Sequence, residues 1–221
     1  MVLLIHHPVS AASRKARLIM AEKHLLFALK EEEPWNLSAD IYKLNPSGTL
    51  PIFVSDGSVI SGNYALTEYL EEVFGEVKLM PSAPKQRSEV RRIEEWFDEK
   101  FYQEVYRNLV FEKVQKRFWL NQAPDSKILK IGLNNLNFHM EYVDWLATQN
   151  NYIAGPDFSM ADISAAVQLS IVDYLGDVPW EAYPNAKIWY SKVKSRSSFK
   201  DILKDSIKGI LPSKHYTDLD F

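Results

Sequence analysis

The chain of 221 residues contains no cysteine. It can therefore form no disulfide, no thiolate metal site and no cysteine nucleophile, and redox reactions that use a protein thiol are excluded. Its five histidines include no pair at the i, i+4 spacing of a helical metal site. His6 and His7 follow an apolar run, and we interpret them as structural or exposed residues. We therefore expect no metal ion and no cofactor.

The sequence also lacks an excess of positive charge and a long apolar run. Its net charge of −3 and pI of about 6.0 give no electrostatic basis for binding nucleic acid. No apolar stretch approaches the roughly 20 residues that span a bilayer. Met1 leads directly into Val2–Ile5 without a basic start or a cleavage site. We therefore expect no signal peptide, no membrane association and a cytoplasmic location.

Strand and helix patterns alternate over residues 1–77. The order strand, helix, strand, helix, strand, strand, helix is predicted over Val2–Ile5, 10–24, Leu25–Leu29, Ala39–Lys43, Ile52–Val54, Ser58–Ile60 and 63–74. The Asp56-Gly57 pair between two apolar runs is a strong hairpin signal. This βαβαββα order predicts an α/β domain.

The pattern of the remaining residues is helical. Gly75–Pro84, which contains two prolines, predicts a linker. Besides the helix described next, apolar residues at three-to-four spacing predict helices over Lys85–Leu120, about 126–148, Asn185–Lys194 and Phe199–Lys204. We therefore expect an all-α domain over residues 85–206 and a C-terminal tail over residues 207–221.

Ser159-Met160-Ala161-Asp162, followed by the apolar run Ile163–Ile171, predicts a helix that is buried nearly all round. The spacing predicts a capping box at its start. The Ser159 hydroxyl would accept a hydrogen bond from the backbone N–H of Asp162, and the Asp162 carboxylate would reach back to the cap residue.

Together with the upstream segment Asn45-Pro46-Ser47-Gly48-Thr49-Leu50-Pro51, this capped helix resembles the glutathione S-transferases. The resemblance covers the whole chain. It implies a thioredoxin-like N-terminal domain over residues 1–77, followed by an all-α C-terminal domain. It also implies a homodimer, with glutathione as a possible substrate.

In this family, the proline that matches Pro51 follows a cis peptide bond. That bond turns the backbone N–H and C=O of the preceding residue, here Leu50, toward solvent, where they pair with glutathione. Gly48 at a turn three residues earlier favours this arrangement, and a cis bond costs little before proline. The alternative is a proline that only starts a strand, where no donor is needed.

Ser10 matches the catalytic hydroxyl of the serine-type members. There the hydroxyl donates to the glutathione sulfur and favours the thiolate, and the positive end of a helix adds to the effect. The alternative is that Ser10 only caps its helix, which is worth about 1 kcal/mol by itself.

Gly62 and Asn63 stand where active transferases usually have an acidic residue followed by serine. In those proteins the acid holds the α-ammonium of glutathione, and the serine and helix N–H groups hold its carboxylate. Gly62 has no side chain to hold the ammonium, while Asn63 can still cap the helix. The departure predicts that glutathione binds weakly or not at all.

Three further segments resemble a bacterial branch of transferase-like proteins that bind the tubulin-like cell-division GTPase FtsZ. They are Trp96–Tyr102 with Arg107–Lys113, Asp173–Trp180, and the end of the chain from His215 to Phe221. This resemblance implies an interaction protein rather than an enzyme.

Two places on the chain are candidate partner contacts. The tail combines acids with apolar anchors, a common composition at interfaces, and its candidate residues are His215, Tyr216, Asp218, Leu219, Asp220 and Phe221. Trp35 stands in an acidic, turn-like segment. The alternatives are a frayed or folded-back tail and a Trp35 ring covered by its own domain. Two hypotheses therefore remain: a non-catalytic or weakly catalytic interaction protein for FtsZ, and a serine-type transferase that joins glutathione to hydrophobic electrophiles.

Overall fold

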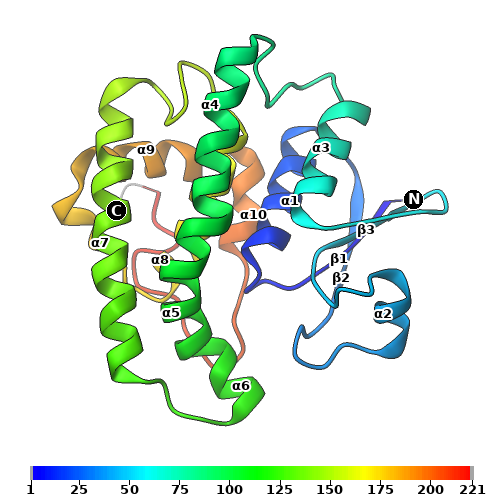
Figure 1. The fold of residues 1–221 in the computed structure, drawn as a ribbon, viewed down its shortest axis with the longest axis horizontal. Helices are drawn as coiled ribbons and strands as arrows, with labels where there is room; N and C mark the ends of the chain where they lie inside the picture. Colours follow the sequence, from blue (N-terminus) through cyan, green and yellow to red (C-terminus); the bar gives the residue numbers. More distant parts are fainter. Residues whose placement is uncertain (1, 220–221) are drawn as a thin grey trace. The chain divides into compact units, whose positions relative to one another are not determined.

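The computed structural model describes residues 2–219 (Figure 1). The chain divides into two compact units, one ending at Lys78 and the other beginning at Leu79. Each unit is described by itself. No helix within the described residues is both long enough and apolar enough to cross a bilayer.

The first unit has the predicted βαβαββα order. Its elements are β1 (Val2–His6), α1 (Ala11–Glu22), β2 (Phe27–Glu31), α2 (Ala39–Leu44), β3 (Ile52–Ser55), β4 (Ser58–Ser61) and α3 (Asn63–Val73). The sheet order is β2-β1-β3-β4, with β1 parallel to β2 and the other two pairs antiparallel. Helices α1 and α3 contact each other. This is the mixed sheet of a thioredoxin-like domain.

Local chemistry explains the turns of this unit. Asp56 and Gly57 have φ of 47° and 82°, and Ser55 pairs with Ser58 across them, as a two-residue hairpin with positive φ at both positions requires. The predicted start of the second strand at Leu25 is wrong. His24 has φ of 56°, and the N–H of Leu25 donates to the carbonyl of Met20, so these residues still end α1.

The second unit is helical. One helical path combines α4 (Pro84–Glu95), the π-helical segment η1 (Trp96–Tyr106), α5 (Arg107–Val110), the π-helical segment η2 (Phe111–Gln115) and α6 (Lys116–Leu120). It covers the segment predicted as one helix and ends at Asn121, whose left-handed φ of 50° suits a helix end. The remaining elements are α7 (Ser126–Gln149), α8 (Met160–Tyr174), η3 (Trp180–Ala182), α9 (Pro184–Lys194), η4 (Ser197–Phe199) and α10 (Lys200–Leu203).

Helix α8 forms the centre of this unit, and all of its residues are buried. It contacts α4, η1 and α9. The predicted capping box is present at its start. Asp162 Oδ2 accepts from the backbone N–H and the hydroxyl of Ser159 at 2.9 and 3.1 Å. Oδ1 accepts from the N–H of Ile153 at 3.1 Å and from Trp189 Nε1 at 2.8 Å. The Asp162 carboxylate therefore links three segments at one buried position: the start of α8, the loop at Ile153 and the helix that contains Trp189.

Candidate functional site

The loop before β3 has the predicted shape. The Leu50–Pro51 peptide bond is cis, which confirms that prediction. Asn45 organises the loop, because its amide donates to the carbonyl and the hydroxyl of Thr49 at 2.8 and 3.1 Å. Gly48 has φ of 64°, and a Cβ there would lie 2.7 Å from Cε1 of Tyr42. Only glycine fits this position without displacing the tyrosine ring.

Ser10 lies beside this loop. Its Oγ caps α1 by accepting from the N–H of Ser13 at 3.2 Å, and it donates to the carbonyl of Leu50 at 3.5 Å. The structure therefore brings together Ser10, Leu50 and Pro51, which are distant in the sequence. The first turn of α1 carries no acidic residue, so the positive end of the helix acts at this hydroxyl undiminished. A thiolate could be stabilised here if a thiol ligand were held in place.

The start of α3 lacks the group that would hold such a ligand by its amine. Gly62 is the N-cap residue, with φ of 90° and no side-chain cap bond, and the first turn of α3 contains no acid. The expectation that Asn63 caps the helix is wrong, because Asn63 is the first helical residue. A side chain at position 62 would be strained at this φ. The glycine therefore suits the backbone at this turn and offers no charge to an ammonium group.

Trp35 packs within its own unit. Its ring meets the ring of His7 edge-on, with centroids 5.0 Å apart, and its Nε1 donates to Glu33 Oε2 at 3.1 Å. His7 Nδ1 accepts from the N–H of Val9 at 3.2 Å, just before Ser10. The half-buried Trp35 therefore connects the turn after β2 to the segment that positions Ser10. No sequence pattern indicated this pair.

Burial lowers the pKa of both histidines at the end of β1. The pKa of His6 falls to about 4, with Arg17 and His7 adding to the effect of burial. The pKa of His7 also falls to about 4, and Arg14 contributes. Both side chains are therefore neutral at pH 7. Because both are buried, the pair is structural and not exposed.

The described part of the C-terminal tail is folded onto the helical unit. The N–H and hydroxyl of Ser213 donate to the carbonyls of Tyr174 and Asp173, both at 2.8 Å. The Lys194 ammonium donates to the carbonyls of His215 and Asp218 at 3.1 and 2.6 Å. The tail is thus neither frayed nor without partners over this stretch.

The predicted partner residues of the tail differ in their exposure. Tyr216 is fully buried, and its hydroxyl donates to the carbonyl of Ile202 at 3.2 Å, so its predicted role as a partner contact does not fit the folded tail. His215 is half-buried, while Asp218 and Leu219 are exposed. Asp220 and Phe221 lie outside the described residues. The accessible candidates within the described tail are therefore Asp218 and Leu219, with His215 at their edge.

Ser213, His215 and Asp173 lie together but do not form a hydrolytic triad. Nε2 of His215 lies 2.8 Å from Asp173 Oδ1 and 3.4 Å from the Ser213 hydroxyl. A relay needs one ring nitrogen on the acid and the other on the serine. Because a single nitrogen faces both groups, this cluster holds the tail in place rather than activating a nucleophile.

An aromatic stripe lies across η1 and α7, formed by the rings of Trp96, Phe138, Tyr142 and Trp145. The Trp96 ring is 6.2 Å from Phe138 and 4.5 Å from Tyr142, and Tyr142 is 6.1 Å from Trp145. Phe138 and Trp145 are 54% and 55% exposed. Ile131, Phe138 and Trp145 follow one another at seven-residue intervals, which places them on one face of α7. This spacing is visible in the sequence and was not used to predict the surface.

Comparison with known proteins agrees with this geometry. The family "Glutathione S-transferase, N-terminal domain" matches residues 9–73. FtsZ-localized protein A from Caulobacter vibrioides is 40% identical over 99% of this chain and 97% of its own length. A crystal structure of a glutathione S-transferase from Rhodospirillum rubrum F11 matches with a TM-score of 0.98 and 44% identity over all of both chains.

The structure of FzlA from C. crescentus is similar as well. It matches with a TM-score of 0.97 and 40% identity, covering 100% of this chain and 99% of that one. The similarity in sequence and in fold thus extends over the whole of both units. The chain belongs to the glutathione S-transferase family.

Proposed function

We propose that this protein is a non-catalytic or weakly catalytic homodimer that acts as an interaction protein for FtsZ. The observation that carries the proposal is the start of α3, where Gly62 replaces the acid that would hold the glutathione amine. A hydrogen bond to a charged group is worth about 1.5–3 kcal/mol. Its loss weakens binding by about 10- to 150-fold. The site therefore keeps the cis-proline loop but has little affinity for the tripeptide.

The 40% identity to FtsZ-localized protein A over nearly the whole chain supports FtsZ as the partner. The exposed tail residues Asp218 and Leu219 offer an apolar anchor beside a charge. Trp35 adds a half-buried indole in the first unit. The proposed partner-binding residues within the described part of the chain are Trp35, Asp218 and Leu219. Asp220 and Phe221 are proposed from the sequence alone.

The aromatic stripe supports the homodimer. Exposed rings in a contiguous row are uncommon on monomers and are typical of protein interfaces. Two cations flank the stripe: Arg92 lies 5.9 Å from the Tyr142 ring, and Lys100 lies 5.6 Å from the Trp96 ring. A second copy of this chain would cover the apolar rings. The Arg92 and Lys100 side chains would then lie at the edge of the interface.

A serine-type transferase is the second candidate, and Ser10 favours it. The hydroxyl lies at the positive end of α1, beside the carbonyl of Leu50. On this hypothesis Ser10→Ala abolishes conjugation of glutathione to an electrophile. If the protein is instead a non-catalytic interaction protein, the wild type itself shows no appreciable conjugation. Ser10→Ala then has no measurable effect.

Co-sedimentation with FtsZ filaments tests the proposal. The wild-type protein should pellet with filaments assembled in GTP, and millimolar glutathione should leave the bound fraction unchanged. Leu219→Asp places a charge on the exposed tail and should weaken binding by at least about tenfold. Leu211→Asp is the matched control, because Leu211 is 89% exposed, precedes the proposed contacts and receives the same change.

Two results would contradict the proposal. If the wild-type protein stays in the supernatant while binding glutathione, it is not an FtsZ interaction protein. If Leu219→Asp and Leu211→Asp bind filaments equally well, the tail is not the contact, even when the wild-type protein pellets.

A further inference from the structure

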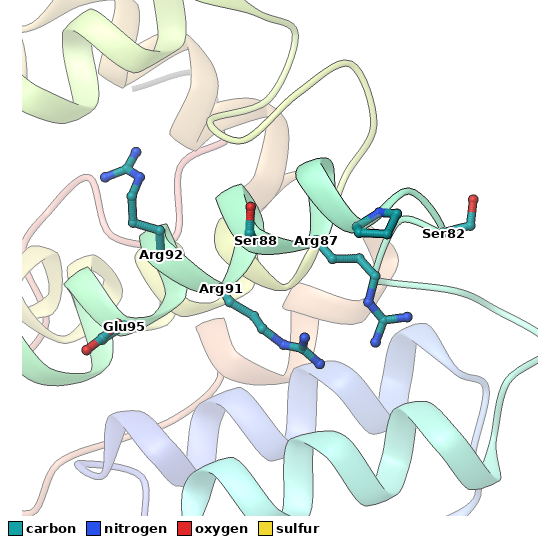
Figure 2. Close-up of a pocket in the computed structure, with 7 residues that line it drawn as sticks. Ser82, Arg87, Ser88, Arg91, Arg92 and Glu95 are labelled. Atoms are coloured by element: carbon teal, nitrogen blue, oxygen red, sulfur yellow. The ribbon is translucent and has the colours of Figure 1, made fainter.

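Lys194 on α9 is the one lysine or arginine of the helical unit that is buried within the described residues. The other cations of this unit are half-buried or exposed. Figure 2 shows three of them, Arg87, Arg91 and Arg92, around a groove of about 570 Å³ along α4. A lysine is almost never fully buried unless its ammonium group has partners. The burial of Lys194 therefore indicates specific partners inside the unit.

The partners of Lys194 lie in the C-terminal tail. Its Nζ donates to the carbonyl of His215 at 3.1 Å and to that of Asp218 at 2.6 Å. The N–H of Asp218 donates to the same His215 carbonyl at 3.0 Å, which closes residues 215–218 into a turn. Lys194 therefore holds the carbonyls of the first and the last residue of this turn at once.

The ring inside the turn belongs to the same arrangement. Tyr216 is fully buried, and Lys194 Nζ lies 6.0 Å from the centroid of its ring and 5.8 Å from that of Tyr190. A cation at this distance from the face of an aromatic ring is attracted to it. Burial lowers the pKa of Lys194, and the negative charges of Asp173 and Asp218 oppose this fall. The turn is thus fixed from inside the unit.

The residues proposed to contact the partner lie at the end of this turn. Asp218 is exposed, and Leu219, which follows the turn, is 37% exposed. The hydroxyls of Ser213 and Tyr216 attach the tail further upstream. Lys194 extends this attachment to Asp218. The backbone that carries the exposed residues is therefore ordered before any partner binds.

A surface that is already ordered loses less conformational entropy when a partner binds. We propose that Lys194 is the positioning residue of the partner-binding tail. By holding both carbonyls of the turn, it presents Asp218 and Leu219 to the partner as a preformed surface. This inference rests on the proposed function and adds to it the residue on which the shape of the contact surface depends.

Limited digestion with trypsin measures whether Lys194 holds the turn. Lys214 is exposed, and trypsin cuts the bond after it when the turn opens. Lys194→Met keeps an apolar side chain of similar length and removes the N–H donors. It should release the peptide of residues 215–221 at least about tenfold faster than the wild-type protein does, because the open form is more populated.

Lys192→Met is the matched control. Lys192 lies on the same helix, and its Nζ donates to the carbonyl of Asn151 at 3.1 Å and lies 3.9 Å from the centroid of the Tyr152 ring. The substitution makes the same change in charge and removes the same kinds of contact away from the tail. It should leave the rate of cleavage after Lys214 within about twofold of the wild-type rate.

Co-sedimentation with FtsZ filaments measures the consequence for binding. Lys194→Met should weaken binding by at least about tenfold, and Lys192→Met should not. Adding Lys194→Met to Leu219→Asp should cause little further loss, because the two substitutions act on the same surface. Melting curves establish that the variants are folded. If Lys194→Met does not unfold cooperatively, Lys194→Gln, which keeps an N–H donor on a shorter side chain, should show both effects to a smaller degree.

The outcomes distinguish the inference from the proposed function. Unchanged cleavage in Lys194→Met, or faster cleavage with unchanged filament binding, would overturn the inference and leave the proposed function standing. A fully additive loss in the double variant would also overturn it, because Lys194 would then act outside the tail surface. A wild-type protein that stays in the supernatant would instead refute the proposed function, and the inference with it, whatever the trypsin result.

Discussion

Asp162→Ala is expected to lower the free energy of unfolding by about 4 kcal/mol and the melting temperature by about 8–16 °C. The carboxylate is fully buried and accepts four hydrogen bonds, two from Ser159, one from Ile153 and one from Trp189. Burial raises its pKa, and these four donors oppose the rise. Alanine would leave all four donors without an acceptor, and each unsatisfied buried donor costs about 1–3 kcal/mol.

Thermal and urea unfolding measure this effect. Asp40→Ala is the matched control, because Asp40 is an exposed acid whose carboxylate bonds Lys43 at 2.7 Å. An exposed pair of this kind is worth at most about 1 kcal/mol. If Asp162→Ala shifts the melting temperature no more than Asp40→Ala does, the carboxylate does not hold the start of α8 as described.

Lowering the pH from 7 to 5 is expected to destabilise the fold by about 2 kcal/mol for each of His6 and His7. Their native pKa values are about 4, against an ordinary value of 6.5. Between these values the unfolded chain binds protons that the native protein does not, so stability falls as the pH falls. pH 5 lies 1.5 units below 6.5, and each unit corresponds to about 1.36 kcal/mol.

Urea denaturation at a series of pH values tests this prediction. His6→Asn and His7→Asn should each flatten the decline between pH 6.5 and 4. His24→Asn is the control, because His24 is exposed and has a left-handed φ of 56° that asparagine tolerates. A decline that is unchanged in both His6→Asn and His7→Asn would show that neither buried imidazole is its source.

The elements of the fold were largely predictable because their signals are local. The Asp56-Gly57 turn, the Ser10 cap and the Ser159–Asp162 capping box each depend on residues within four positions of one another. The error at Leu25 has a local cause as well. An apolar pair there continues the strand pattern, but the left-handed His24 keeps the pair in the turn that ends α1.

The residues of the candidate site were predictable only where they belong to a sequence motif. Ser10, Pro51 and Gly62 were found by their place in a family pattern, and the structure brings Ser10 to the loop of Leu50 and Pro51. The Trp35–His7 contact and the bonds of Lys194 to the tail carbonyls join residues more than 20 positions apart. No periodicity or spacing identifies such pairs, because tertiary packing selects them.

The π-helical segments were missed for a different reason. Apolar residues at three-to-four spacing are compatible with either hydrogen-bonding pattern, so η1 and η2 were predicted as part of one α-helix. The prediction that this segment is helical was correct. Only the hydrogen-bonding pattern of its backbone was predicted wrongly.

The proposed function depends on the start of α3, where Gly62 and an acid-free first turn leave the amine of a glutathione molecule without a charged partner. Isothermal titration of the wild-type protein with glutathione up to millimolar concentration tests it most directly. A ligand present at 100 times its Kd stabilises a protein by about 2.7 kcal/mol, so a parallel melting experiment gives an independent readout. We predict no saturable heat and no shift in melting temperature. A micromolar Kd, with a melting shift that follows the same isotherm, would contradict the account.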